Sequence, residues 1–312
     1  MNFKSVFFNE FNRLRSGWRF TIFQLLIIFF GGIFGRGAQF FLDRVADDFP
    51  GKNLISFVVP NFILLVLALL FGWLCGKFFE DLPFRALGIS LTKNWLRDLF
   101  FGLAIGAVSI FLAVLIAFSF GGMRLEFNSP AGASAILQTL AISFAIFFIG
   151  ATAEEAYFRG YVLQTFSRAE LVWFAIAFTS VFFSFAHFLN PNVSGIAKFN
   201  TALAGVWFGI AYIKTRNLWF PLGIHFAWNW IQGAILGIPV SGITEITTAP
   251  LFSETEKGNE FFTGGNYGIE GGIACTIAII FSTVLVYFIP FLKPTEEMLK
   301  LTSEEKMAET RM

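Results

Sequence analysis

Histidine and cysteine are scarce in this sequence, with two of each among 312 residues. Two cysteines are too few for a disulfide framework or for a zinc site with four cysteine ligands. Cys75 and Cys275 lie in or beside apolar stretches, so we expect both to be small buried apolar residues. The two histidines, His187 and His225, also lie inside apolar stretches, where their presence needs an explanation.

Charged residues are few as well. They make up 14 % of the chain, and the net charge is +1. A nucleic-acid-binding protein needs a concentrated basic face, and because no segment provides one we expect no nucleic-acid partner. Apolar residues make up 56 % of the chain and the mean hydropathy is strongly positive, which is not typical of a soluble domain of this length. The composition predicts a polytopic membrane protein.

Apolar stretches recur along the chain, and an α-helix needs about 20 such residues to cross a membrane. We expect eight spans, at approximately 18–41, 54–75, 99–120, 136–166, 171–189, 199–214, 218–237 and 268–292. The fourth is too long for a simple span and the sixth is short. In the sixth, Gly205 and Gly209 have the small-residue spacing that predicts close helix packing. The fold class is therefore all-α, an integral membrane bundle of about eight transmembrane helices.

Basic residues accumulate on the cytoplasmic side of membrane proteins. With eight spans and the N-terminus inside, 16 of the 22 Lys and Arg residues fall on the side of the two termini. We therefore expect a multi-pass protein of the cell membrane with cytoplasmic N- and C-termini. The first 16 residues contain no short apolar run followed by a small-residue cleavage site, so we expect no cleavable signal peptide.

The chain has no repeat of fixed period and no low-complexity tract, so one integral domain is the simplest division. Within it we distinguish N-terminal transmembrane helices at 1–125, a core at 126–292 and a charged tail at 293–312. The tail lacks apolar periodicity, and we expect it to be a solvated or frayed cytoplasmic end.

Three charged side chains interrupt the fourth apolar stretch: Glu154, Glu155 and Arg159. On a helix, Glu155 and Arg159 share a face and can form an ion pair, while Glu154 is rotated by about 100°. Desolvation and a neighbouring negative charge both raise the proton affinity of a carboxylate, as a general base near neutral pH requires. Glu154 is therefore the candidate base. The alternative is a structural ion cluster at a cytoplasmic helix end.

Each histidine has a partner four residues away, on the same helical face. Phe183 can pack beside the imidazole of His187, and His225 and Asn229 can point an imidazole and a carboxamide into one cavity, where both can donate to a developing oxyanion. The alternatives are an interfacial histidine for the first pair and an interhelical polar clamp for the second. Because ionisable groups at bilayer depth are costly and usually functional, the combination favours a catalytic site inside the membrane.

The order of these motifs resembles a known family. Glu-Glu-x-x-x-Arg at 154–159, Phe-x-x-x-His at 183–187 and His-x-x-x-Asn at 225–229 are similar to the three motifs of the CPBP intramembrane proteases, which include type II CAAX prenyl endopeptidases and bacteriocin-processing or immunity proteins. The resemblance covers roughly residues 130–240. The glycine-rich stretch 264–272 also resembles a segment of many bacterial members.

This resemblance implies an intramembrane endopeptidase that hydrolyses a peptide bond of a membrane-associated substrate, either a CAAX-type prenyl peptide or another membrane peptide. Glu154 matches the glutamate that activates water, and His187 the residue that assists it. His225 and Asn229 match the residues assigned to oxyanion binding. The supporting residues are Glu155, Arg159 and Phe183. The implied partners are membrane lipid and a membrane-associated peptide or protein, and the oligomeric state is left open.

The resemblance does not decide whether the reaction uses a metal ion. Glu154, His187 and His225 can ligate zinc with an open position for water, as in a metalloprotease. No His-Glu-x-x-His sequence occurs, and a metal-free mechanism, equally compatible, is slightly favoured. The main functional alternative is a noncatalytic membrane scaffold or bacteriocin-immunity protein of the same fold. A proton-relay transporter would predict repeated halves or interrupted helices in matching positions, and the sequence has no such repeat.

Overall fold

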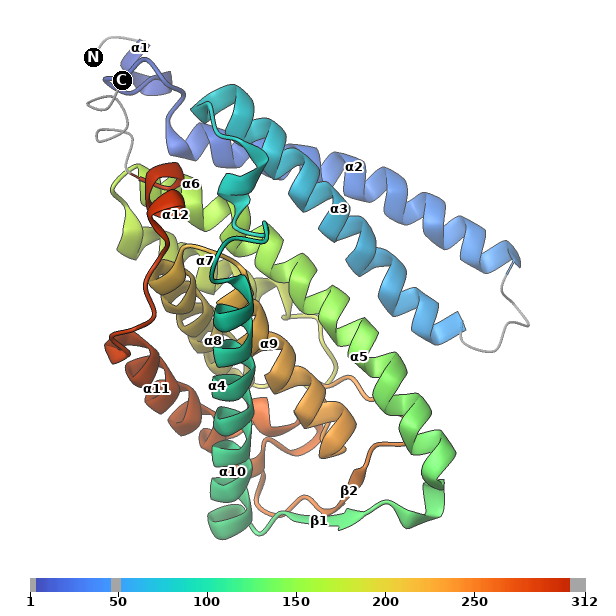
Figure 1. Cartoon of the computed structure of the whole chain (residues 1–312). Coiled ribbons are helices and arrows are strands. Elements are labelled where there is room, and N and C mark those ends of the chain that lie inside the picture. The colour runs from blue at the N-terminus through green and yellow to red at the C-terminus, as the bar shows by residue number, and fades with distance from the viewer. Residues whose placement is uncertain (1–3, 46–51, 304–312) are drawn as a thin grey trace.

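The computed structural model describes residues 4–45 and 52–303, which form a helical bundle with a two-stranded sheet (Figure 1). In chain order the α-helices are α1 (Lys4–Phe7), α2 (Ser16–Val45), α3 (Lys52–Glu80), α4 (Trp95–Ile116), α5 (Ala133–Glu155), α6 (Gln164–Arg168), α7 (Val172–Ala186), α8 (Gly195–Thr215), α9 (Trp219–Trp230), α10 (Glu260–Thr263), α11 (Ile273–Phe288) and α12 (Glu296–Leu301). The π-helical segments η2 (Ala117–Gly121), η4 (Ala156–Leu163) and η5 (Ile231–Ile235) continue α4, α5 and α9. The expected all-α membrane bundle is confirmed.

Five helical segments within the described residues are long and apolar enough to cross a membrane: Ser16–Arg44, Leu54–Glu80, Trp95–Gly121, Ala133–Arg168 and Gly195–Thr215. They coincide with the first four and the sixth of the predicted stretches. The other three stretches fold into shorter helices, since α7, α9 and α11 have 15, 12 and 16 residues. By length and composition alone, five of the eight predicted stretches form helices that can cross a membrane by themselves.

The predicted start of the last span, at residue 268, is wrong. Residues 265–271 form the 3₁₀ turns η6 (Gly265–Tyr267) and η7 (Ile269–Gly271) instead of helix. Gly268 has a φ of +92°, and a Cβ there would lie 1.9 Å from the carbonyl oxygen of Pro239. Only glycine fits such a close backbone approach. The turns hold Glu270 beside the end of α9 rather than on a membrane helix.

Helix α9 lies at the centre of the bundle, and its residues from Phe220 to Trp228 are all buried. It packs backbone to backbone against α4. A Cβ at Gly102 would lie 2.3 Å from the carbonyl oxygen of Phe220, and a Cβ at Gly223 would lie 2.5 Å from that of Leu99. Small residues permit this close approach, which holds the middle of α9 in a fixed position.

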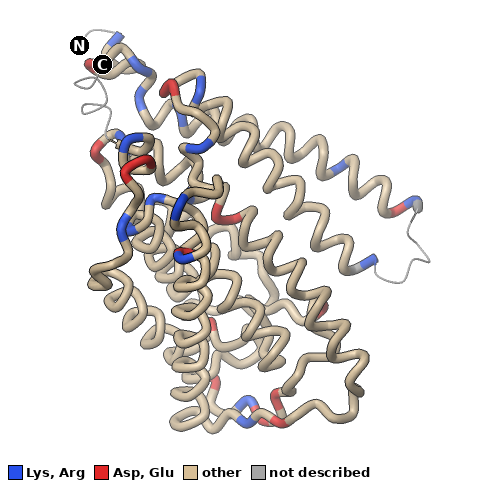
Figure 2. Tube along the Cα trace, in the orientation of Figure 1, with Lys and Arg blue, Asp and Glu red and all other residues tan. Residues whose placement is uncertain are grey.

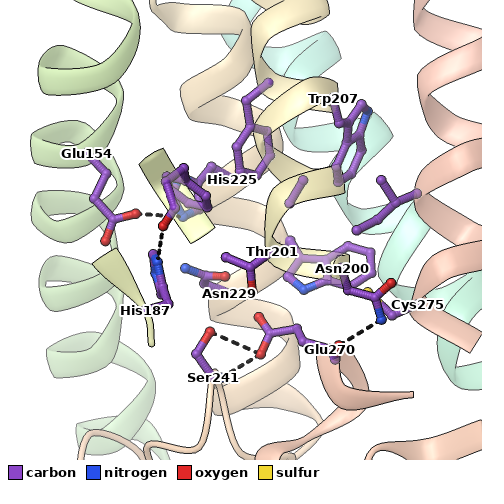
Figure 3. Close-up of a pocket in the computed structure, with 15 residues that line it drawn as sticks. Glu154, His187, Asn200, Thr201, Trp207, His225, Asn229, Ser241, Glu270 and Cys275 are labelled. Carbon is purple, nitrogen blue, oxygen red and sulfur yellow. Dashed lines mark hydrogen bonds and ion pairs between the residues drawn. The ribbon is translucent and has the colours of Figure 1, made fainter. Parts of the chain in front are cut away.

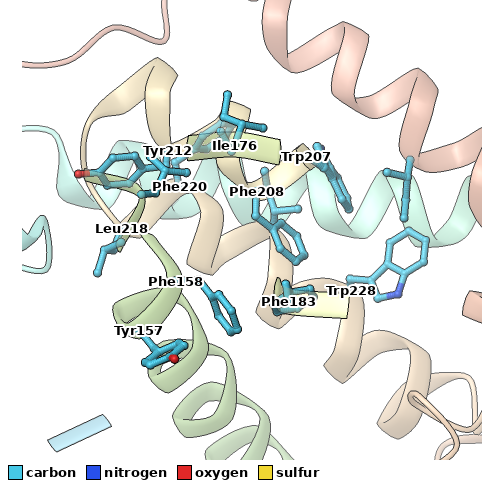
Figure 4. Packing of buried hydrophobic residues seen from close by; sticks show 14 of the residues in the cluster. Tyr157, Phe158, Ile176, Phe183, Trp207, Phe208, Tyr212, Leu218, Phe220 and Trp228 are labelled. Atoms are coloured by element: carbon cyan, nitrogen blue, oxygen red, sulfur yellow. The ribbon is translucent and has the colours of Figure 1, made fainter. Parts of the chain in front are cut away.

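Aromatic residues fill the core beside α9. Figure 4 shows Phe158 of η4 beside Phe183 of α7, which in turn lies near Phe208 of α8. The close packing predicted for Gly205 is confirmed, because a Cβ there would lie 2.6 Å from Cα of Ser180 on α7. The expectation of burial is confirmed for Cys75 and Cys275 as well, at 2 % and 0 % exposure.

Charged residues gather at the ends of the helices and leave the middle of the bundle nearly uncharged (Figure 2). At one end, strands β1 (Arg124–Phe127) and β2 (Phe252–Glu256) pair antiparallel, and they join the α4–α5 connection to the long segment after α9. This small sheet was not expected from the sequence. Helices α1 and α12 lie at the other end (Figure 1).

The beginning of the C-terminal tail is not solvated as expected. It forms α12, where Met298 is fully buried and Glu297 forms an ion pair of 2.6 Å with Arg85. The side chain of Arg168 also donates to the carbonyl oxygen of Ser303. One buried methionine anchors this short helix despite its charged neighbours. The rest of the predicted tail, 304–312, lies outside the described residues.

Candidate active site

The two adjacent glutamates at the end of α5 diverge, as the helical geometry predicts. Glu155 is fully buried, and its Oε1 lies 2.9 Å from Nη1 of Arg159, which forms the expected ion pair. The side chain of Glu154 is 25 % exposed and faces a cavity. The π-helical segment η4 begins directly after them, and such segments are frequent at functional sites.

Arg159 is fully buried in aromatic surroundings. Its guanidinium lies 4.9 Å from the ring centre of Phe183 and 5.1 Å from that of Phe208, and Nη2 donates to the carbonyl oxygen of Gly205. A buried charge is tolerated when it is paired and hydrogen-bonded. Arg159 therefore links η4 to α7 and α8 and holds the carboxylate of Glu155 in place.

His225 on α9 lies between the two glutamates. Its Nδ1 is 2.9 Å from Oε1 of Glu155, and its Nε2 is 3.7 Å from Oε2 of Glu154. The imidazole stacks on the ring of Phe208, with centroids 4.7 Å apart and an interplanar angle of 16°. Oε1 of Glu155 thus contacts both Arg159, in the first sequence motif, and His225, in the third. Neither motif alone predicts the contact with His225.

His187 follows α7 directly and caps its C-terminus. Its Nδ1 lies 2.8 Å from the carbonyl oxygen of Phe183, and the two rings are in contact at 4.7 Å, as the spacing predicts. A carbonyl oxygen accepts only, so Nδ1 carries the proton, and Nε2 of the neutral ring is left basic. The ring of Phe183 is also 6.0 Å from that of His225, which places it between the two histidines.

Two cavities meet at these residues. The first, of about 60 Å³, lies toward α8 and α11, and the second, of about 110 Å³, lies between α3, α5 and the segment after α9. Four residues line both cavities: Glu154, His187, Asn229 and Ser241. Figure 3 shows Glu154, His187, His225 and Asn229 around one space. All four residues predicted to be catalytic are therefore brought together.

Four further polar residues line the first cavity without having been assigned from the sequence: Asn200, Thr201, Ser241 and Glu270. Ser241 and Asn200 carry no sequence signal, since isolated Ser and Asn residues are common in helices and turns. Glu270 does carry one. It is a carboxylate within a predicted apolar span, and the criterion that selected Glu154 also applies to it.

The zinc alternative finds no support in the arrangement of side chains. In the described ranges, no group of three or more His, Cys, Asp or Glu side chains is placed to hold a metal ion. His225 directs Nδ1 at Glu155, and His187 directs Nδ1 at a backbone carbonyl. Both bonds leave Nε2 of the ring without a hydrogen bond to the described residues and by themselves favour neither a metal-bound nor a metal-free site.

Comparison with known proteins identifies the family. A model of the family described as "Type II CAAX prenyl endopeptidase Rce1-like" matches residues 136–231. An uncharacterized Bacillus subtilis protein, YyaK, is 30 % identical over 226 residues, which cover 67 % of this chain and 70 % of the relative. The chain belongs to the Rce1-like family. The match with the Rce1-like family contains all three motifs and lies inside the predicted core at 126–292, so the expected resemblance to CAAX-type intramembrane proteases is confirmed.

Proposed function

We propose that this protein is an active intramembrane endopeptidase that uses water activated by Glu154 and His187 to hydrolyse a peptide bond of a membrane-associated substrate. Membership of the Rce1-like family supports the reaction class. The observation that carries the proposal is the convergence of Glu154, His187 and Asn229 on the junction of two cavities, with His225 beside them.

Glu154 acts as the general base. Its carboxylate is partly exposed to the cavity, whereas Glu155 is fully buried and already bound to Arg159 and His225. A water molecule at the junction of the cavities can lie within hydrogen-bonding reach of Glu154 and of Nε2 of His187. A base must reach the proton that it removes, and of the two glutamates only Glu154 has access to water.

His225 and Asn229 stabilise the oxyanion. Nδ1 of His225 donates to the carboxylate of Glu155, so Nε2 can donate to an oxyanion only when the ring carries both protons. Nδ1 lies 2.9 Å from Oε1 of Glu155, and Nε2 lies 3.7 Å from Oε2 of Glu154. The carboxamide of Asn229, four residues later on the same helix face, supplies a second donor.

The reaction proceeds in two steps. The water oxygen bonds to the carbonyl carbon of the substrate while Glu154 takes one water proton, and the carbonyl oxygen becomes an oxyanion held by His225 and Asn229. The oxyanion then re-forms the carbonyl, the C–N bond breaks, and the leaving nitrogen takes up the proton from Glu154 or through His187. The products are a carboxylic acid, which keeps the second water proton, and an amine; transfer of that proton to the amine gives a carboxylate and an ammonium group.

The proposal is tested by incubating purified protein in lipid with a panel of prenylated CAAX-type peptides and unmodified transmembrane peptides, and analysing the products by mass spectrometry. We expect wild type to cut at least one peptide, with and without the chelator EDTA. We expect Glu154→Gln to be inert and the exposed control Glu256→Gln, on β2, to cut like wild type. Cleavage by folded Glu154→Gln at the wild-type rate would overturn the assignment.

A further inference from the structure

The cavity toward α8 and α11 is acidic. Glu154 stands at its inner end and Glu270 on its wall, and its other lining residues include no lysine or arginine. Arg159 lies behind Glu155 and does not line it. The cavity therefore sets two carboxylates against two histidines, His187 and His225, and no lysine or arginine among the described residues lines it.

Glu270 is held in place by a network of neutral groups. Its Oε2 accepts from the backbone N–H and the hydroxyl of Ser241. The side chain of Asn200 donates to the carbonyl oxygens of Glu270 and Gly272, at 2.8 and 2.9 Å, and accepts from Thr276. Figure 3 shows the carboxylate of Glu270 facing the space shared with Thr201 and Asn229. The position of this charge is fixed by three chain segments.

The carboxylate of Glu270 lacks a fixed cationic partner. In the parts of the chain that the structure describes, no lysine or arginine pairs with it, and its ionisable neighbours are His187, Tyr267 and Cys275. Burial raises the pKa of Glu270. A carboxylate removed from bulk water is costly unless it is paired as well as hydrogen-bonded. A cationic group of a bound ligand would supply the missing partner.

A second unsatisfied group lines the same cavity. Trp207 is 1 % exposed, and its indole N–H has no hydrogen-bond acceptor among the described residues. Buried polar groups without partners are rare in native proteins. A peptide brings both kinds of missing partner, since its backbone carbonyls accept from an indole and its amines donate to a carboxylate.

We propose that this cavity is a substrate subsite in which Glu270 binds a protonated primary amine, either the α-amine of a peptide or the side chain of a lysine. This inference rests on the proposed peptidase function and specifies the substrate on one side of the scissile bond. A volume of about 60 Å³ accommodates a small group but not a prenyl chain, because pockets for larger ligands measure about 300 Å³ or more.

The same charge disfavours a free peptide carboxylate in this cavity, because two carboxylates would face each other without a cation between them. The second cavity differs in character. Its lining includes Phe57, Ile146, Phe147, Val240 and Ile246. Glu154 is the carboxylate that lines both cavities, whereas Glu270 lines only the first, so the amine-bearing side of the substrate lies toward Glu270.

The experiment measures peptide binding to the full chain in lipid nanodiscs, in a Glu154→Gln background that keeps the peptides intact. Three C-terminally amidated pentapeptides of Ala and Leu are compared by calorimetry: one with a free α-amine, one acetylated, and one acetylated with lysine in place of the first residue. We expect the peptides with an amine to bind about tenfold more tightly than the acetylated one, as a hydrogen bond to a charged group predicts.

Glu270→Gln is then added to the Glu154→Gln protein. It removes the charge of residue 270 but keeps an oxygen that can accept from Ser241, and we expect it to abolish the tighter binding of the peptides with an amine. Adding Glu256→Gln, an exposed control with the same loss of charge, leaves the preference intact. Comparison of the α-amine and lysine peptides tells which source of amine is bound. Equal binding of all three peptides, absence of binding, or a preference that survives Glu270→Gln overturns the inference. Cleavage is not measured here, so failure of the subsite and failure of the peptidase reaction are distinguishable.

Discussion

Glu155 is the residue that connects the parts of the candidate site. Its Oε1 lies 2.9 Å both from Nη1 of Arg159 and from Nδ1 of His225. Removing one partner of a buried ion pair leaves an uncompensated charge in the interior, which costs more than the pair itself contributes. Glu155 and Arg159 line neither of the two cavities, and their contacts fix the position of His225.

We expect Arg159→Ala to lower the free energy of unfolding by about 3–5 kcal/mol, because Glu155 stays buried without its cation. The matched control is Arg85→Ala, which breaks the solvent-exposed ion pair with Glu297 and should cost about 1 kcal/mol or less. Unfolding in detergent, followed by circular dichroism against denaturant, measures both. Equal stability losses would contradict a structural role for the buried pair.

The four-residue spacing of side chains predicted the contacts within single helices. Residues four apart on a helix meet whatever surrounds them, so the ion pair of Glu155 with Arg159 and the ring contact of Phe183 with His187 followed from the sequence. The contact of Glu155 with His225 joins helices 70 residues apart. It depends on how the bundle packs, which no local pattern contains.

At the scale of elements, the contact between α7 and α8 sets the position of His187. Gly205 on α8 lies against Ser180 of α7 and also offers its carbonyl oxygen to Arg159. The small-residue spacing in the sequence predicted this contact. The turns that hold Glu270 were not predicted, although the glycine-rich stretch 264–272 carries a turn signal, because the apolar length of the last predicted span begins inside it.

Gly205→Ala should separate α7 from α8, since the added Cβ would lie 2.6 Å from Cα of Ser180. Overpacking of this kind costs about 1–3 kcal/mol, and a shifted α7 moves His187 and lowers the cleavage rate. Gly195→Ala on the same helix is the control, because a Cβ there meets nothing within 4 Å. Thermal unfolding and cleavage rates of the two variants are compared. A Gly205→Ala protein as stable and active as the control would refute the role of this contact.

At the scale of the whole molecule, the composition predicted the membrane bundle but not the short elements at its two ends. Apolar length predicted the long helices α2 to α5 and α8. The docking of α12 was missed, because one buried residue, Met298, is enough to anchor a charged segment. The sheet between β1 and β2 was missed as well, because its strands have four and five residues and lie 125 or more residues apart.

The charge bias predicts that α12 and the β1–β2 sheet lie on opposite sides of the membrane, with α12 in the cytoplasm. In a protein with both native cysteines replaced by serine, we expect Glu256→Cys on β2 to react with a membrane-impermeant maleimide in intact cells. Glu297→Cys on α12 should react only after permeabilisation. The reverse pattern would place both termini outside and overturn the predicted orientation.

The central claim is that Glu154 and His187 activate the same water molecule, and single-turnover cleavage rates test it most directly. Wild type, Glu154→Gln, His187→Gln and the double variant are compared with a peptide that wild type cuts, after each variant has been shown to fold. Each single variant should lose about 10²- to 10⁴-fold in rate. The double variant should be little slower than the singles, because residues that act as a unit are not additive. Single variants that retain the wild-type rate would contradict the account.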